Sequence, residues 1–116
     1  DRDDHSIESG NIQGKVMIGK NSRISDDSMI RGPVAIGNGV VIEDGAFIGP
    51  YSSIGDNCVI RKASIENSIV MKNSYIDTDN TIVDSIIGES TKIMSVGNMK
   101  PNGKRMMIGE NSIIYI

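Results

Sequence analysis

Residues 36–60 read IGNGVV-IEDGAF-IGPYSS-IGDNCV-I, four hexads in which an isoleucine returns at every sixth position. The same step extends toward the N-terminus, so nine isoleucines stand in strict register, at positions 12, 18, 24, 30, 36, 42, 48, 54 and 60. Beyond residue 60 the step is five or six, and these anchors continue as Ile65, Val70, Ile76, Ile82, Ile87, Ile93, Ile108 and Ile114. A period held this long predicts a repeat architecture.

The hexad spacing determines which backbone can carry it. Six is a multiple of the two-residue period of a strand and does not fit the three-, four- and seven-residue spacing of a helical stripe. Three residues after an anchor stand types that tolerate a left-handed bend, at Asn21, Asp27, Gly39, Gly45, Asn57, Asn73, Asp79 and Asn111. Four residues after an anchor stand small or modestly apolar types, at Ser22, Ser28, Val34, Val40, Ala46, Ser52, Cys58 and Ser64. Each hexad is therefore expected to form a strand of about three residues and a bend, with successive coils pairing as parallel strands.

The composition excludes helical folds. The chain of 116 residues has 21 Ile and 8 Val but no Leu and no Trp, and it has 13 Gly. Helical bundles depend on Leu, Ala, Glu and Lys, whereas β-branched residues with Gly, Ser, Asn and Asp are typical of strands and turns.

Charge and cysteine content restrict the partners and the compartment. The net charge of −3 gives no basic surplus for binding nucleic acid or an anionic membrane. A single cysteine, Cys58, can form no internal disulfide, and apolar residues never run beyond five in a row, too few for a membrane span. We therefore expect a cytoplasmic protein with no nucleic acid or membrane partner.

The hexad resembles the hexapeptide repeat of left-handed β-helices. Its pattern is an aliphatic residue, Gly, two variable residues, a small residue and a variable one, as in Ile36 to Val41. In that family three hexads make one triangular coil, so the fifteen anchors from Ile12 to Ile93 imply about five coils. The handedness comes from this resemblance alone. We expect one left-handed parallel β-helix domain over residues 1–116, with repeats over 12–93, a loop over 94–107 and a closing rung over 108–116. Because the first methionine is Met17, we also expect the chain to be the C-terminal part of a longer protein.

A closer resemblance lies in four segments, 48–57, 65–71, 82–88 and 97–112. They are similar to the C-terminal domain of the long glucose-1-phosphate thymidylyltransferases of archaea and actinobacteria, in which five-residue steps also occur. The resemblance implies a parent enzyme that joins dTTP and glucose 1-phosphate into dTDP-glucose, releasing pyrophosphate with Mg²⁺. That chemistry would belong to an N-terminal catalytic domain, and this domain would serve assembly or regulation with no cofactor of its own.

Two other functions remain open from the residues. Left-handed β-helices include acyltransferases that bind coenzyme A between subunits and use a histidine as general base. The only histidine, His5, precedes the first coil among acidic residues, where a solvated role is the simpler reading. Cys58 occupies a small inward position and is expected to act as a buried hydrophobe and not as a nucleophile. A purely structural repeat domain is the third reading, and one histidine is too few for a three-histidine zinc site.

The basic segment near the C-terminus contains Lys100, Lys104 and Arg105, with Pro101 and Gly103 among them. These cations are candidates for binding a phosphate-bearing cofactor or another domain. The alternative is a solvated loop that covers the open end of the coil, whose unpaired strand edge would otherwise be exposed.

Several outward positions are apolar. Residues eighteen apart stack on one face of a triangular coil, so Met29 is expected above Phe47 and Val41 above Val59, with Ala35 also outward. Stacked apolar columns indicate a contact surface. The resemblance implies packing of such prisms into a homotrimer, and contact with the missing catalytic domain would produce the same pattern.

Overall fold

The computed structural model describes residues 11–95 and 113–116, which form sixteen short strands in three parallel sheets and contain no helix. Sheet A contains β1 (Ile12–Gln13), β4 (Met29–Arg31), β7 (Phe47–Ile48), β10 (Ser64–Glu66) and β13 (Thr81–Val83). Sheet B contains β2 (Val16–Ile18), β5 (Val34–Ile36), β8 (Ser52–Ile54), β11 (Ile69–Val70) and β14 (Ile86–Ile87). Sheet C contains β3 (Arg23–Ile24), β6 (Val41–Ile42), β9 (Val59–Arg61), β12 (Tyr75–Asp77), β15 (Lys92–Met94) and β16 (Ile113–Tyr115).

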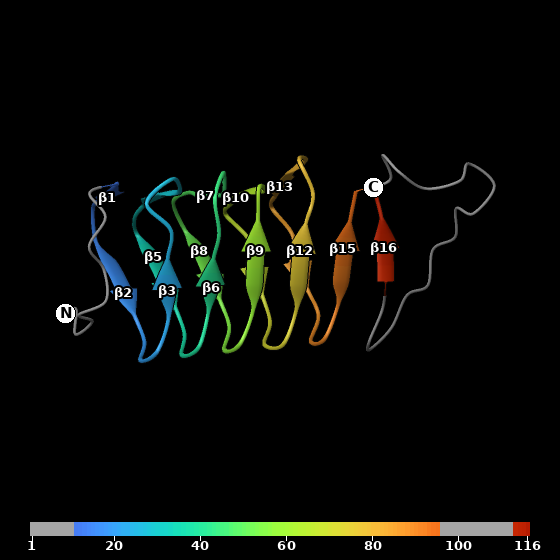
Figure 1. Ribbon diagram of the computed structural model, residues 1–116, viewed down its shortest axis with the longest axis horizontal. Coiled ribbons are helices and arrows are strands. Elements are labelled where there is room, and N and C mark those ends of the chain that lie inside the picture. The colour runs from blue at the N-terminus through green and yellow to red at the C-terminus, as the bar shows by residue number, and fades with distance from the viewer. Residues whose placement is uncertain (1–10, 96–112) are drawn as a thin grey trace.

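The chain visits the three sheets in turn and then repeats, so each set of three strands is one coil of a triangular prism. Figure 1 shows the strands of sheet C running upward on the near side while the chain advances from left to right, which makes the winding left-handed. Five complete coils run from β1 to β15, as the fifteen anchors predict. The predicted left-handed parallel β-helix is confirmed.

The anchors form the core. They pair in register from coil to coil, as Ile30 with Ile48, Ile48 with Ile65 and Ile65 with Ile82 on sheet A. Twelve of them are buried, namely Ile18, Ile30, Ile36, Ile42, Ile48, Ile54, Ile60, Ile65, Val70, Ile76, Ile82 and Ile93. The anchors Ile12, Ile24, Ile87 and Ile114 are partly buried against them. The interior is therefore a continuous aliphatic stack that follows the axis of the prism.

The small inward residues lie where the hexad predicts them, with one exception. Ser22, Ser28, Ser52 and Cys58 are buried, but Ser64 is only half-buried. The five-residue step from Ile60 to Ile65 removes one residue from the corner before it. Ala63 therefore takes the inward place, and Ser64 turns outward in register with Phe47.

The bends use left-handed backbone as expected at Asn21, Gly39, Gly45, Asn57 and Asn73, which all have positive φ. Asp27 and Asp79 were expected to do the same and do not. Hydroxyl groups close these two turns instead: the N–H of Asp27 donates to Ser25 Oγ at 3.0 Å, and the N–H of Asn80 donates to Thr78 Oγ1 at 3.2 Å. Such serine and threonine turns need no left-handed residue. Asn111 lies outside the described residues.

The five-residue steps are deletions at corners, as predicted. Each shortened corner contains one non-glycine residue with positive φ: Lys62 in the step from 60 to 65, Asn67 in the step from 65 to 70, and Asp84 in the step from 82 to 87. Full-length corners such as those at Asn21 and Asn57 use the same conformation, so the shortened corners keep this bend with one residue fewer.

The glycines after the anchors make room for a side chain of the next coil. The N–H of Asn38 donates to Asp56 Oδ1 at 2.9 Å, and the N–H of Lys20 donates to Asn38 Oδ1 at 2.8 Å. A Cβ at Gly37 would overlap that Asp56 oxygen, and one at Gly19 would overlap the Asn38 oxygen. Glycine is therefore required at this corner because neighbouring coils approach there so closely.

We predict that Ile48→Ala will lower the free energy of unfolding by about 2–5 kcal/mol, because it opens a cavity in a stack that cannot collapse around it. Val83→Ala, on the exposed side of β13, is the matched control and is expected to cost less than about 0.5 kcal/mol. Denaturant unfolding followed by far-ultraviolet circular dichroism measures both. A loss at Ile48 no larger than the loss at Val83 would contradict the core assignment.

Candidate functional site

The predicted outward column on sheet A is present. Met29 pairs in register with Phe47, and the column continues to Ser64 and Thr81. Met29 is exposed and Phe47 is half-buried. The apolar part of this face therefore covers two coils and becomes polar toward the C-terminal end.

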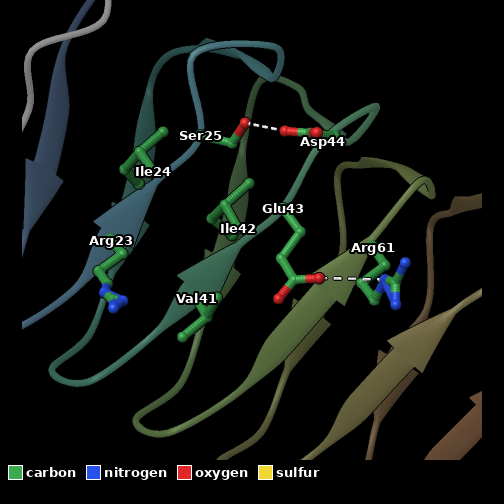
Figure 2. Close-up of a pocket in the computed structure, with 8 residues that line it drawn as sticks. All are labelled: Arg23, Ile24, Ser25, Val41, Ile42, Glu43, Asp44 and Arg61. Atoms are coloured by element: carbon green, nitrogen blue, oxygen red, sulfur yellow. Dashed lines mark hydrogen bonds and ion pairs between the residues drawn. The ribbon is translucent and has the colours of Figure 1, made fainter.

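The predicted column on sheet C is also present, and Val41 pairs in register with Val59. Arg23 precedes them and Tyr75 follows them in the same column. Figure 2 shows Arg23 and Val41 side by side on this face, at the edge of a shallow hollow of about 330 Å³. Its lining consists of Arg23, Ile24, Ser25, Val41, Ile42, Glu43, Asp44 and Arg61.

Most charges around this hollow are paired. Arg61 Nε lies 3.0 Å from Glu43 Oε1, and its guanidinium also lies 3.9 Å from Asp77 Oδ2 in the following coil. Lys62 Nζ lies 3.6 Å from the other oxygen of Asp77, and Ser25 Oγ donates to Asp44 Oδ1. Pairs this exposed are individually worth less than about 1 kcal/mol. They offset the charge of Arg61, whereas Arg23 forms no ion pair with another described residue.

Tyr75 stands beside this ladder of charges. Its hydroxyl donates to Asp77 Oδ2 at 3.3 Å. Burial raises the pKa of the Tyr75 phenol above its usual range, and the negative charge of Asp77 raises this pKa further. The phenol therefore stays protonated at neutral pH and acts as a hydrogen-bond donor.

Cys58 behaves as the sequence predicts. Its side chain is buried among the inward residues, and Sγ donates to the carbonyl oxygen of Met71 at 3.1 Å. Burial raises the pKa of the Cys58 thiol. A buried, protonated thiol is a poor nucleophile.

Four predicted candidates cannot be placed. His5, Lys100, Lys104 and Arg105 all lie outside the described residues, as does most of the stretch expected to hold the loop and the closing rung. Within residues 11–95 and 113–116, no three side chains of His, Cys, Asp or Glu come together as metal ligands would. In that same part of the chain, no helix is long and apolar enough to cross a membrane.

The outer face of sheet B is the most exposed apolar face of the described residues, and it was not predicted from the sequence. The outward residue of each strand in sheet B gives the column Met17, Ala35, Ser53, Ile69 and Ile86, all paired in register. The exposed fraction is 50% for Met17, 44% for Ile69 and 72% for Ile86. The strands of sheet B contain no charged residue. Shortened corners change the spacing between successive residues of this column to sixteen and seventeen. A spacing of eighteen residues therefore does not connect Ile69 and Ile86 to Met17.

The described residues thus form a repeat domain with a filled interior and apolar columns on its outer faces. Residues 30–115 match the family described as the GMPPB C-terminal domain. The chain belongs to this family, and it is a domain related to sugar nucleotidyltransferases.

A curated relative supports the same class. The chain is 41% identical over 56 residues to the low-salt glycan biosynthesis nucleotidyltransferase Agl11 of Haloferax volcanii. The matched region is 48% of this chain and 16% of that protein. The similarity therefore concerns a small part of a much longer enzyme.

We predict that the free energy of unfolding will fall as the pH rises above about 9. The Cys58 thiol ionises in the unfolded chain near its ordinary pKa of about 9, whereas the native thiol stays protonated until a higher pH. Below that range both states hold the proton, so the contribution of this group does not vary with pH. Denaturant unfolding between pH 7 and about pH 10.5 measures the slope.

Cys58→Ala is the comparison for this prediction. It is expected to make the alkaline slope smaller without removing it, because Tyr75, whose pKa is also raised, keeps its own share at higher pH. Identical slopes for the two proteins would show that the thiol ionises equally easily in the folded and unfolded states.

Proposed function

We propose that the chain is the non-catalytic assembly domain of a sugar-1-phosphate nucleotidylyltransferase. The proposed parent reaction joins dTTP and glucose 1-phosphate into dTDP-glucose and releases pyrophosphate. The observation that carries the proposal is the family membership of residues 30–115, together with apolar columns on the outside of a prism whose interior is filled.

The composition of the prism supports a non-catalytic role. The inward positions of the described coils hold aliphatic, small or hydroxyl side chains. On the sheet C face, Arg61 forms ion pairs with Glu43 and Asp77. Nucleotidyl transfer needs groups that position the phosphates and neutralise their developing charge. We therefore assign the chemistry, and the Mg²⁺ that would assist it, to a separate catalytic domain of the parent protein.

The thymidylyl specificity comes from the resemblance of segments 48–57, 65–71, 82–88 and 97–112 to thymidylyltransferase C-terminal domains. The five-residue steps in that resemblance form shortened corners at Lys62, Asn67 and Asp84. The test is to assay the whole gene product with each nucleoside triphosphate against glucose 1-phosphate and mannose 1-phosphate. We expect pyrophosphate release to be fastest with dTTP and glucose 1-phosphate. A preference for another pair would reject the thymidylyl part and keep the assembly role.

The chain of 116 residues alone is expected to release no pyrophosphate from any of these pairs. It is also expected to consume no acetyl-coenzyme A in the presence of amino sugars. Turnover of the thioester that survives His5→Ala would identify the domain as an acyltransferase with some other base, and it would overturn the assembly proposal.

The assembly part of the proposal is a homotrimer formed through the columns on sheets A and C. Burying a Phe or Val side chain is worth about 1.5–3 kcal/mol. Repeating such contacts around a closed threefold axis can offset the entropy lost on association, although area alone does not set affinity.

Phe47→Glu is predicted to abolish the trimer while leaving the β-sheet circular dichroism intact, because it places a charge in the centre of the sheet A column. Sedimentation equilibrium at about 100 µM measures the mass. Asn80→Glu, on the exposed corner between sheets C and A, adds the same charge outside the columns and is expected to change nothing. A trimer that survives Phe47→Glu would show that the columns are not the contact.

A further inference from the structure

The face of sheet B differs from the other two in carrying no charge. Its column of Met17, Ala35, Ser53, Ile69 and Ile86 contains three of the exposed large hydrophobic side chains of the described residues, and neither of the predicted columns belongs to it. We refer to these five residues as the sheet B column. An exposed apolar face of this kind indicates a binding partner. The shape of the face and the charges along its edges indicate which partner it fits.

The relief of the face changes from one end to the other. In the first coils a hollow of about 260 Å³ is lined by Lys15, Met17, Pro33, Val34, Ala35 and Ser52. In the last coils Ile69 and Ile86 stand exposed on the strand surface. The middle of the column is the small Ser53. One half of the face therefore contains a hollow and the other half exposes two isoleucines, with the third coil between them.

The charges on the corner between sheets A and B follow the same order. Lys15 stands on the first coil and Asp84 on the fifth, both exposed. The residues at the same position of the coils between them, Pro33, Tyr51 and Asn67, carry no charge. This edge is thus basic beside the hollow and acidic beside the exposed Ile86.

We propose that the sheet B face binds a second copy of itself, antiparallel, about a twofold axis parallel to the strands at the third coil. That rotation reverses the direction of the prism and brings each corner against the same corner of its partner. Lys15 then faces Asp84 of the partner copy. The partner's exposed isoleucines meet the hollow beside Met17 and Ala35, and Ser53 lies next to its own symmetry mate.

The other corner of sheet B distinguishes this arrangement from a parallel one. Its exposed residues, from the first coil to the fifth, are Lys20, Asn38, Asp56, Lys72 and Glu89. The antiparallel pair places Lys20 against Glu89. It also places one pair of like charges, Asp56 and the Asp56 of the other copy, on the axis. A parallel pair would instead place Lys15 against Lys20 and Asp84 against Glu89. Rim charges mainly select orientation and partner, and here they favour the antiparallel pair.

The size of the face determines how strong the association is. Five strands at about 4.8 Å and a face about 20 Å wide give roughly 400–500 Å² per copy. Stable interfaces bury about 800 Å² per partner. The twofold contact is therefore expected to be weak and dependent on salt, and to be stable only at high concentration or within a larger assembly. It is separate from the proposed trimer and from the proposed enzymatic activity of the parent protein.

A charge exchange tests the orientation in the whole chain, in a Phe47→Glu background that removes the proposed trimer contact. Lys20→Glu and Glu89→Lys are each expected to weaken self-association about tenfold in sedimentation equilibrium. Mixing the two variants is expected to restore it, because both rim pairs are again opposite in sign in the mixed pair. The double variant is expected to associate as the parent does. Failure of the mixture to exceed either single variant would overturn the antiparallel pairing.

A cysteine test locates the axis. In a Cys58→Ala background, Ser53→Cys is expected to form a disulfide-linked pair in air at least tenfold faster than Asp79→Cys, a more exposed control on the corner between sheets C and A. Met17→Cys is expected to link to Ile86→Cys in a mixture but slowly to itself. Self-linking of Met17→Cys as fast as in the mixture would indicate a parallel pair and reject the proposal. Equal rates for Ser53→Cys and Asp79→Cys would reject sheet B as the contact between two copies. Binding of a catalytic domain to this face would give that result.

Discussion

Backbone hydrogen bonds between successive coils are the constraint on which the rest of this domain depends. Gly19 donates to the carbonyl oxygen of Ile36, and Gly37 donates to that of Ile54, each at 2.9 Å. This ladder holds neighbouring coils at the spacing of a parallel sheet, so residues one coil apart must stack directly. The aliphatic core, the close glycine corners and the outward columns all follow from that single spacing.

The sequence was sufficient for the core because the ladder imposes a regular period on it. A side chain such as Ile48 must sit between Ile30 and Ile65, and only an unbroken inward series can fill such a stack. The bends were predicted less well. At Asp27 and Asp79 a neighbouring hydroxyl closes the turn, and residue type at one position does not reveal which of two hydrogen-bonding patterns will form.

The outer faces were predicted only where the hexad is uninterrupted. Met29 with Phe47, and Val41 with Val59, are separated by eighteen residues and are found by counting. The sheet B column passes two shortened corners before it reaches Ile69 and a third before Ile86, so the count fails there although the register does not. Cys58 was placed correctly because an inward position fixes its surroundings. The exposed faces depend on which corner loses a residue, and that is a property of the folded coil.

The shortened corners also mean that the coils are not interchangeable parts. The anchors of sheet C lie eighteen residues apart from Ile24 to Ile60, then sixteen to Ile76 and seventeen to Ile93. The perimeter of the prism therefore shrinks partway along its length. A gene duplication that copied one eighteen-residue coil would fit among the first three coils, where the perimeters agree. The same insertion after Ile76 would place a wider ring between narrower ones, so its longer corners would have no residue opposite them in the coils on either side. Growth of such a domain by repetition is thus easier to accommodate among the first three coils than after them.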